Sequence, residues 1–227
     1  MVDSKKLKIK IFADGADKQS MLEMYRRPSI SGLTTNPTLM RKSGVTDYKS
    51  FCLEILEIVT AKPISFEVFS DDFEEMKAQA LEIASWGDNV FVKIPITNTK
   101  GESSLPLVRD LVANKVKVNI TAVFTLEQVM ATSKTLSAEV PSYVSIFAGR
   151  IADTGIDPIP LVEESLAILK NLPLCEVIWA SPREALNIVH ADSIGCHVIT
   201  VTQDLIKKQE LFGHDLSEYS LETVKMF

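Results

Sequence analysis

The sequence is poor in the residues that build disulfide frameworks and metal centres. Its 227 residues include only three cysteines and three histidines. The cysteines, Cys52, Cys175 and Cys196, are far apart and lie in apolar segments, which is typical of reduced core thiols. The histidines share no metal-ligand spacing with one another or with the cysteines. We therefore expect no disulfide and no metal, and structural or surface positions for the histidines.

Long apolar runs are also missing. No stretch approaches about 18 uninterrupted apolar residues, the length of a membrane-spanning helix. The segment before Asp14 contains basic residues but no apolar run of signal-peptide length. Both absences argue against a membrane protein and against an exported one. We expect a cytoplasmic protein.

Signatures of nucleic-acid and nucleotide binding are absent as well. With 24 Lys+Arg against 30 Asp+Glu the net charge is -6. No dense basic cluster offsets this charge, which argues against a nucleic-acid surface. Neither GxGxxG nor the P-loop motif occurs, and the turn after the first strand-like segment reads ADGAD. No cofactor is predicted, and an anionic substrate has to be bound by a few local groups.

What the sequence does contain is a regular alternation of strand-like and helical segments. The apolar strand-length segments are residues 9–13, 31–35, 63–69, 90–96, 116–124, 143–149, 175–181 and 197–201. The helical segments are residues 16–27, 46–60, 73–87, 125–137, 159–172, 183–191 and 203–211, and residues 97–108 are interpreted as a loop. This alternation predicts a (β/α)8 barrel of the α/β class rather than an open doubly wound sheet. We expect one domain over residues 1–227, with an extra helix at residues 220–227.

Seven of the eight predicted strands end on side chains that can form hydrogen bonds or carry charge. The catalytic groups of such barrels lie at the carboxyl ends of the strands and in the loops that follow. In chain order these side chains are Asp14, Thr34, Thr35, Asn36, Glu67, Lys93, Asn119, Thr121, Ser145, Arg150, Ser181 and Arg183. Thr200 and Thr202, at the eighth strand, have no predicted role.

Lys93 is the most informative of these residues, because it interrupts the apolar segment VFVKIPIT. A buried cation is costly unless it is paired or gives up its proton. Burial, and cations such as Arg150 or Arg183 nearby, would favour a neutral, nucleophilic amine, and Asp14 and Glu67 supply two carboxylates for proton transfer. This combination predicts Schiff-base aldol chemistry on a phosphorylated substrate.

Simpler roles are open for several of these residues. Lys93 could lie on an edge strand with its ammonium in solvent, and Glu67 could point outward between helices. Asp14 could cap the first helix, and the TTNP segment could be only a connecting turn. Arg150 and Arg183 could form surface salt bridges. The positions of these side chains in the fold distinguish the alternatives.

Eight motifs follow one another between Lys8 and Thr202: FADGAD, GLTTNPTL, ISFEVF, VFVKIPIT, KVNITAVF, SIFAGRIADTG, WASPREAL and IGCHVIT. Together they resemble the transaldolase family. The resemblance implies a class I aldolase barrel that moves a dihydroxyacetone unit from fructose 6-phosphate or sedoheptulose 7-phosphate to an aldose phosphate, without metal or cofactor. It also implies carbohydrate metabolism, either the pentose phosphate pathway or a specialised sugar pathway, and a homo-oligomer.

The resemblance further implies a role for each polar residue. Lys93 matches the Schiff-base lysine, and Asp14 matches the group that takes the donor hydroxyl proton as the carbon bond breaks. Glu67 and Thr121 match the pair that holds the water for imine formation and hydrolysis. The implied substrate-binding residues are Thr34, Asn36, Asn119, Ser145 and Phe147, together with the phosphate ligands Arg150, Ser181 and Arg183.

Two positions separate the branches that this resemblance covers. Fructose 6-phosphate aldolases, which release free dihydroxyacetone, have glutamine in place of Glu67 and tyrosine in place of Phe147, so both residues here favour transfer. Gly15, Trp179 and Pro182 depart from the family pattern. Trp179 lies two residues before Ser181, so we expect it on the same face, where it would reshape the acceptor pocket. A lyase that releases dihydroxyacetone and a non-catalytic sugar-phosphate-binding barrel remain the alternatives.

Overall fold

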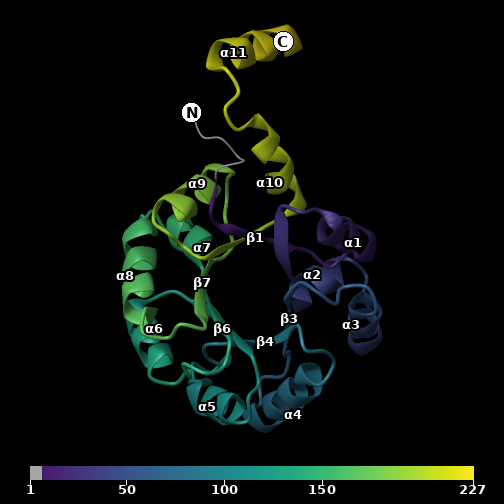
Figure 1. Cartoon of the computed structure of the whole chain (residues 1–227), viewed down its shortest axis with the longest axis vertical. Helices are drawn as coiled ribbons and strands as arrows, with labels where there is room; N and C mark the ends of the chain where they lie inside the picture. Colours follow the sequence, from purple (N-terminus) through teal and green to yellow (C-terminus); the bar gives the residue numbers. More distant parts are fainter. Residues whose placement is uncertain (1–6) are drawn as a thin grey trace.

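Eight short strands pair side by side, all in parallel, and β8 pairs with β1 to close the sheet on itself. Their bounds are β1 Lys10–Asp14, β2 Ile30–Thr34, β3 Ile64–Glu67, β4 Val90–Pro95, β5 Val118–Val123, β6 Ser142–Ile146, β7 Cys175–Trp179 and β8 Val198–Val201. Helices follow the strands and form a ring around them (Figure 1). The predicted (β/α)8 barrel is therefore confirmed.

Several helices begin after a side chain that satisfies free backbone N–H groups. Asp17, Asp47, Asp72 and Thr125 each accept a hydrogen bond from the first turn of the helix that follows. The bounds are α1 Lys18–Arg26, α2 Pro37–Lys42, α3 Tyr48–Leu56, α4 Phe73–Ala84, α5 Leu105–Ala113, α6 Leu126–Ser133, α7 Ala148–Asp153, α8 Ile159–Leu169, α9 Leu186–Ser193, α10 Gln203–Lys208, the short 3-10 helix η2 Gln209–Leu211 and α11 Leu216–Met226.

Three helices were missed by the sequence pattern. α5 begins inside the segment predicted as a loop after the fourth strand, and Pro106 lies in its first turn, where a helix tolerates proline. α2 also begins at a proline, Pro37. α7 begins directly after β6, in residues that the apolar pattern assigned to that strand and to the loop after it. Two of the three are only six residues long, too short for a clear helical period.

The strands alternate between two apolar environments, as the period of two in a strand requires. Their outward side chains join the helices in one large core. The inward side chains Phe12, Phe91, Tyr143, Ile178, Ala180 and Val198 form a second cluster inside the barrel. Gly32 is needed there, because a Cβ atom at this position would lie 2.6 Å from the Phe12 ring. This second cluster fills the barrel beneath the polar residues of the site.

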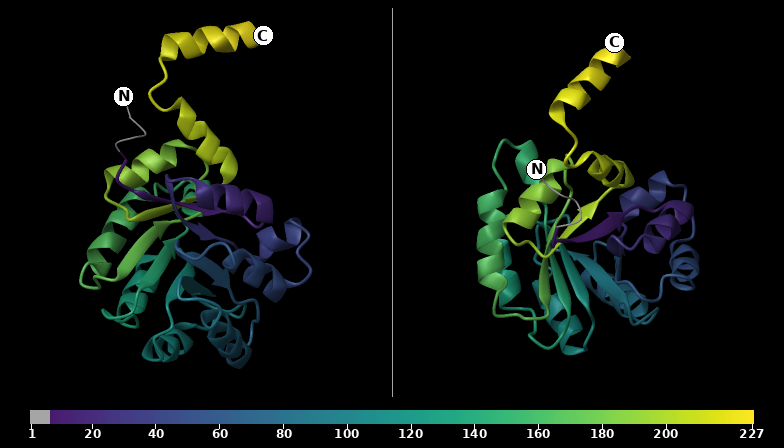
Figure 2. Two further views of the ribbon diagram at one scale, coloured as in Figure 1. Left: turned by 45° about the vertical axis from the view of Figure 1, so that its right-hand side comes forward. Right: turned by 45° about the horizontal axis from the view of Figure 1, so that its top comes forward.

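The computed structural model describes residues 7–227. The six residues before them, which the prediction of a single domain over residues 1–227 includes, lie outside the described part, and that domain assignment stays a prediction. The predicted terminal helix is confirmed as α11, which begins four residues earlier than expected, at Leu216. α11 stands away from the barrel in every view (Figures 1 and 2), and none of its side chains is buried.

Candidate active site

The carboxyl ends of all eight strands surround one cavity of about 640 Å³. Phe147 and all the polar strand-end residues predicted from the sequence except Thr35, which is fully buried, line this cavity: Asp14, Thr34, Asn36, Glu67, Lys93, Asn119, Thr121, Ser145, Phe147, Arg150, Ser181 and Arg183. These residues come from segments spread over most of the chain. The closed parallel sheet brings them together, because parallel strands all end on the same side.

Lys93 lies in the middle of β4 and points into the barrel. Its side chain is 11% exposed, and its Nζ atom lies 3.4 Å from Glu67 Oε2 and 3.4 Å from the backbone oxygen of Thr35. The register of the sheet sets Glu67 and Asn119 beside Lys93 on the two neighbouring strands. The alternatives of an edge-strand lysine and an outward Glu67 are therefore wrong.

Asp14 and Glu67 are the two carboxyl groups of the cavity. Thr34 Oγ1 donates a hydrogen bond of 2.9 Å to Asp14, whereas the N-cap of α1 is Asp17, so the helix-cap alternative for Asp14 is wrong. Loss of hydration raises the pKa of both carboxyls above their ordinary values, and the charge of Lys93 opposes this shift only in part. Carboxyls that hold their protons to higher pH suit proton transfer near neutrality.

A chain of hydrogen bonds fixes the amide of Asn119. Ser145 Oγ donates to its oxygen at 2.7 Å, and its Nδ2 atom donates to Ser65 Oγ at 3.0 Å. Ser65 is a residue that the sequence pattern missed, although it lies two positions before Glu67 on the same strand face. Thr121 Oγ1 is buried and has no hydrogen-bond partner among residues 7–227, so it is available to a group in the cavity.

The TTNP segment is both a turn and part of the cavity wall. Asn36 is the N-cap of α2, and its Oδ1 atom accepts a hydrogen bond of 3.0 Å from the backbone of Leu39. The cap occupies the amide oxygen and leaves the Nδ2 group for a ligand. The segment is therefore a turn, but the alternative that it is only a turn is wrong, because Asn36 also lines the cavity.

Ser181 reaches the cavity through an unusual backbone conformation. Trp179 ends β7 and is buried in the core between the strands and the helices, while the next residue, Ala180, lines the cavity. Ser181 then has φ 59, in the left-handed region, which breaks the alternation of the strand. Trp179 and Ser181 consequently face different environments, and the expectation that Trp179 reshapes the acceptor pocket is wrong.

The other two departures from the family pattern lie in or near the loops around the cavity. A Cβ atom at Gly15 would have no heavy atom within 4 Å, so a larger residue would fit at this position and packing does not require glycine there. Asp14 receives its support from Thr34 instead. Nothing in the structure explains why proline occupies position 182.

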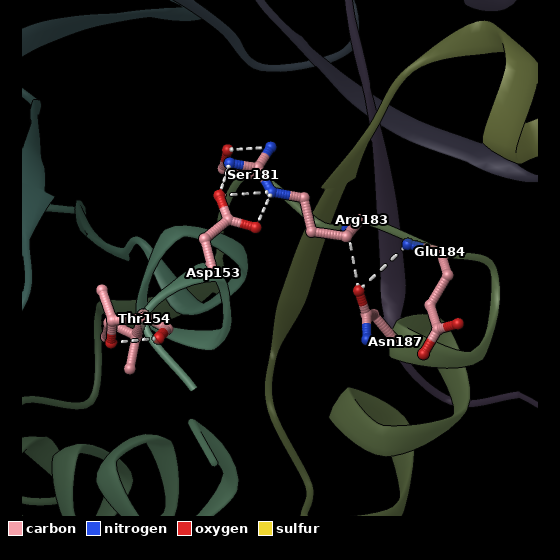
Figure 3. A network of polar contacts seen from close by, with 7 residues as sticks. Asp153, Thr154, Ser181, Arg183, Glu184 and Asn187 are labelled. Carbon is pink, nitrogen blue, oxygen red and sulfur yellow. Dashed lines mark hydrogen bonds and ion pairs between the residues drawn. The ribbon is translucent and has the colours of Figure 1, made fainter. Parts of the chain in front are cut away.

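Two arginines border the cavity at the ends of β6 and β7. The guanidinium carbon of Arg150 lies 5.8 Å from the centre of the Phe147 ring. Arg183 forms an ion pair with Asp153 and also donates a hydrogen bond of 3.2 Å to Ser181 Oγ (Figure 3). The salt-bridge alternative thus holds for Arg183, whose side chain lines the cavity at the same time.

Several lining residues had no sequence signal that assigned them to the site. They are Pro37, Thr38, Leu39, Lys42, Pro95, Ala122, Phe124, Ala180 and Thr200. A helix starting at the proline of TTNP would have predicted Thr38 and Lys42. Ala122, with φ 58, departs from ordinary strand geometry, and a single sequence does not reveal such a distortion.

Residues 7–227 contain no group of three or more His, Cys, Asp or Glu side chains placed to hold a metal ion. Within the same range, no helix combines the length and the apolar character needed to cross a membrane.

Comparison with known proteins agrees with this geometry. Residues 11–225 match the family model described as transaldolase/fructose-6-phosphate aldolase. A probable transaldolase of Thermoanaerobacter sp. (strain X514) is 33% identical over 96% of this chain and 95% of its own. A probable transaldolase of Streptococcus equi subsp. zooepidemicus (strain MGCS10565) is 34% identical over 95% of this chain and 95% of its own. A probable transaldolase of Methanococcus maripaludis (strain C7) is 32% identical over 94% of this chain and 94% of its own. The chain therefore belongs to the transaldolase/fructose-6-phosphate aldolase family.

Proposed function

We propose that this protein is a transaldolase that works through a Schiff base on Lys93. The position of the Lys93 amine supports this best, because it lies 3.4 Å from the Glu67 carboxylate in a cavity that Asp14 also lines. Imine formation needs a desolvated amine next to groups that move protons. Membership of the family and the names of the relatives agree with this activity.

In the proposed reaction the Lys93 amine attacks the ketone carbon of the donor, and loss of water gives a protonated imine. Asp14 then takes the proton of the donor hydroxyl while the carbon–carbon bond breaks, and the electron pair of that bond moves to form an enamine. The first aldose phosphate leaves. An acceptor aldehyde reacts with the enamine by the reverse steps, and hydrolysis frees the amine. Covalent retention of the three-carbon unit makes the reaction a transfer.

The remaining residues have binding and positioning roles in this proposal. Glu67 and Thr121 hold the water that imine formation releases and hydrolysis consumes. The dihydroxyacetone part is bound by Asn36, Asn119 and Ser145, with Thr34 holding Asp14. Arg150, Ser181 and Arg183 bind the phosphate. The two arginines supply charge-assisted donors, which suit a phosphate dianion.

The decisive experiment uses fructose 6-phosphate as donor and erythrose 4-phosphate as acceptor. We expect sedoheptulose 7-phosphate to form, with little free dihydroxyacetone. Free dihydroxyacetone as the main product would mean a lyase of the same family. If borohydride reduction in the presence of donor leaves no adduct on any lysine, the protein is a sugar-phosphate-binding barrel without this chemistry.

The proposal includes independence from metal ions and a place in cytoplasmic sugar metabolism, in the pentose phosphate pathway or a specialised sugar pathway. The cavity supplies the Lys93 amine, a second amine from Lys42, two carboxyls and two guanidinium groups, so it does not require a Lewis acid for the aldol step. Transfer that survives dialysis against a chelator would support this part, and activity restored only by added metal would contradict it.

Phe147 is expected to control the ratio of transfer to release. Its ring lines the cavity beside Phe124 and carries no proton donor. In Phe147→Tyr, a phenolic hydroxyl can protonate the enamine and promote hydrolysis of the imine that results. We expect free dihydroxyacetone to rise several-fold relative to sedoheptulose 7-phosphate, measured in one assay. Phe124→Tyr is the matched control, and an unchanged product ratio in Phe147→Tyr would refute the assignment.

We also infer a homo-oligomer in which α11 docks on a second copy of the chain. The apolar side chains Leu216, Leu221, Val224 and Met226 of α11 are 55–81% exposed. A helix of 11 residues is only marginally stable by itself, and α11 stands clear of its own barrel (Figure 2). A surface outside this barrel is needed to cover it.

Light scattering after size exclusion tests this inference. We expect Val224→Glu combined with Leu221→Glu to reduce the molar mass to that of one chain, because two buried charges would oppose docking. Ile156→Glu, which changes a residue that is 60% exposed elsewhere on the barrel, should leave the mass unchanged. A wild-type monomer, or a variant that keeps the full mass, would contradict the role of α11.

A further inference from the structure

The contact between Asp153 and Arg183 lies at the phosphate end of the cavity and has a defined geometry. Asp153 is the last residue of α7, and Arg183 lies in the loop between β7 and α9. Arg183 Nε donates to both carboxylate oxygens of Asp153, at 2.9 and 3.0 Å, and Nη2 donates to Oδ2 at 2.5 Å (Figure 3). Such paired contacts restrict the plane of a guanidinium group as well as its position.

The contacts of Arg183 leave donors free for a ligand. A guanidinium group has five N–H donors. Asp153 engages Nε and one hydrogen of Nη2, and Ser181 Oγ accepts one hydrogen from Nη1 at 3.2 Å. One hydrogen therefore remains on each terminal nitrogen. Arg183 and Ser181 both line the cavity, so an anion there can receive both donors together with the Ser181 hydroxyl.

The backbone on both sides of this contact is held in place. Asn187 Oδ1, on α9, accepts hydrogen bonds from the backbone N–H groups of Arg183 and Glu184, at 2.8 and 3.2 Å (Figure 3). On the other side, a Cβ atom at Gly149 of α7 would lie 1.6 Å from the backbone oxygen of Ser181. Glycine at this position lets α7 touch the loop directly. The carboxylate and the guanidinium therefore meet on two segments that pack against each other.

Asp153 has two opposite effects on a phosphate bound at Arg183: its charge repels the phosphate, and its contact orders the guanidinium that binds the phosphate. Its negative charge repels a phosphate, and because the Asp153 carboxylate is paired with Arg183 and lies near Arg150, its pKa is held below the ordinary value. The carboxylate is about half exposed, so water and salt screen this repulsion. The side chain of Arg183, 45% exposed, would otherwise sample many rotamers, and ordering it costs binding energy.

We propose that Asp153 is a positioning residue that orients the Arg183 guanidinium for the substrate phosphate. The proposal rests on the assignment of Arg150, Ser181 and Arg183 to the phosphate in the proposed function. Asp153 itself donates nothing to the ligand. It holds one edge of the guanidinium, so that the N–H groups left free stay directed at the phosphate site beside Ser181.

The test compares Asp153→Asn with the wild type in two measurements. We expect KM for fructose 6-phosphate to rise about tenfold while kcat at saturation stays within about twofold, because the chemistry at Lys93 is untouched. Turnover of unphosphorylated fructose should not change. By calorimetric titration, the dissociation constant of inorganic phosphate should rise by about the same factor as KM. Asp153→Glu keeps a carboxylate on a longer stem and should recover part of the loss.

Glu164→Gln, which removes a charge from the neighbouring helix α8, is the matched control and should behave as wild type. A lower KM or tighter phosphate binding in Asp153→Asn would show that Asp153 acts as a competing anion. Unchanged values would show an ordinary surface ion pair, and either result overturns the proposal. If the wild-type protein transfers no dihydroxyacetone, the proposed function fails, yet the phosphate titrations of the two proteins still decide the role of Asp153.

Discussion

Replacing Lys93 with methionine should abolish the borohydride-trapped adduct and reduce dihydroxyacetone transfer by at least about a thousandfold, the loss typical of removing a covalent nucleophile. Methionine has nearly the length of lysine and can fill the same space between β3 and β5 without an amine. The adduct is measured by mass spectrometry of peptides after reduction in the presence of fructose 6-phosphate. In the wild type it should map to Lys93 alone.

Lys117→Met provides the matched control. Lys117 directly precedes β5, and its ammonium lies 5.9 Å from the centre of the Phe91 ring and contacts the backbone oxygen of Asp88. It is therefore a lysine beside the same barrel but outside the cavity. This variant should keep the adduct and nearly all of the activity. An adduct on another lysine, or full transfer by Lys93→Met, would remove the basis of the proposed mechanism.

The second large effect is expected for Asp14→Asn, which keeps the shape of the side chain and removes its ability to take a proton. Transfer should fall by a factor of about 10² to 10⁴, the usual contribution of a general acid–base group. The adduct on Lys93 should still form, because in the proposed mechanism imine formation uses Glu67 and its water. The two readouts together separate proton transfer at Asp14 from a general loss of the site.

The same variant should be more stable than the wild type at neutral pH. Loss of hydration raises the pKa of Asp14 in the folded protein, so the folded state binds its proton more tightly than the unfolded state. The free energy of unfolding therefore falls as the pH rises from the ordinary pKa through the raised one. At higher pH the folded protein keeps the full cost of burying the ionised carboxylate. Asparagine avoids this cost. The gain in Tm should disappear below about pH 4, where the carboxyl is protonated in both states.

Asp17→Asn is the control for both measurements. Asp17 lies three residues beyond Asp14 but caps α1, and its carboxylate accepts a hydrogen bond of 2.8 Å from the backbone of Ser20. Asparagine is an equally good N-cap, so activity and stability should change little. A loss of transfer in this variant equal to that of Asp14→Asn would show that the effect comes from the first β/α loop as a whole.

The strand ends were predictable because two rules act locally along the chain. Apolar alternation locates a strand, and the barrel places chemistry where each strand ends, so Glu67, Lys93 and Asn119 could be picked out before the fold was known. The register then sets these three residues side by side. The direction in which each side chain points followed from the period of two wherever the strand was regular.

The same rule failed where the backbone leaves strand geometry. Trp179 and Ser181 have the spacing of one strand face, but the left-handed conformation of Ser181 separates them. α5 was missed because its residues follow a polar segment with glycine, which is typical of a loop. A pattern read along the chain does not contain the Ser181 conformation. It does contain α5, whose residues Leu107, Val108, Leu111 and Val112 have helical spacing and are buried, but the loop interpretation ended at residue 108.

Residue type and short-range periodicity were enough to predict the class of fold, the order of the strands and the polar residues at the strand ends, with Lys93 as the candidate nucleophile. Only the tertiary structure decided which partners those residues have. Ser65 beside Asn119, Thr34 beside Asp14 and Asp153 beside Arg183 each join different β/α units. Lateral pairing of the parallel strands creates these contacts, since it brings to one rim the segments that the chain itself separates.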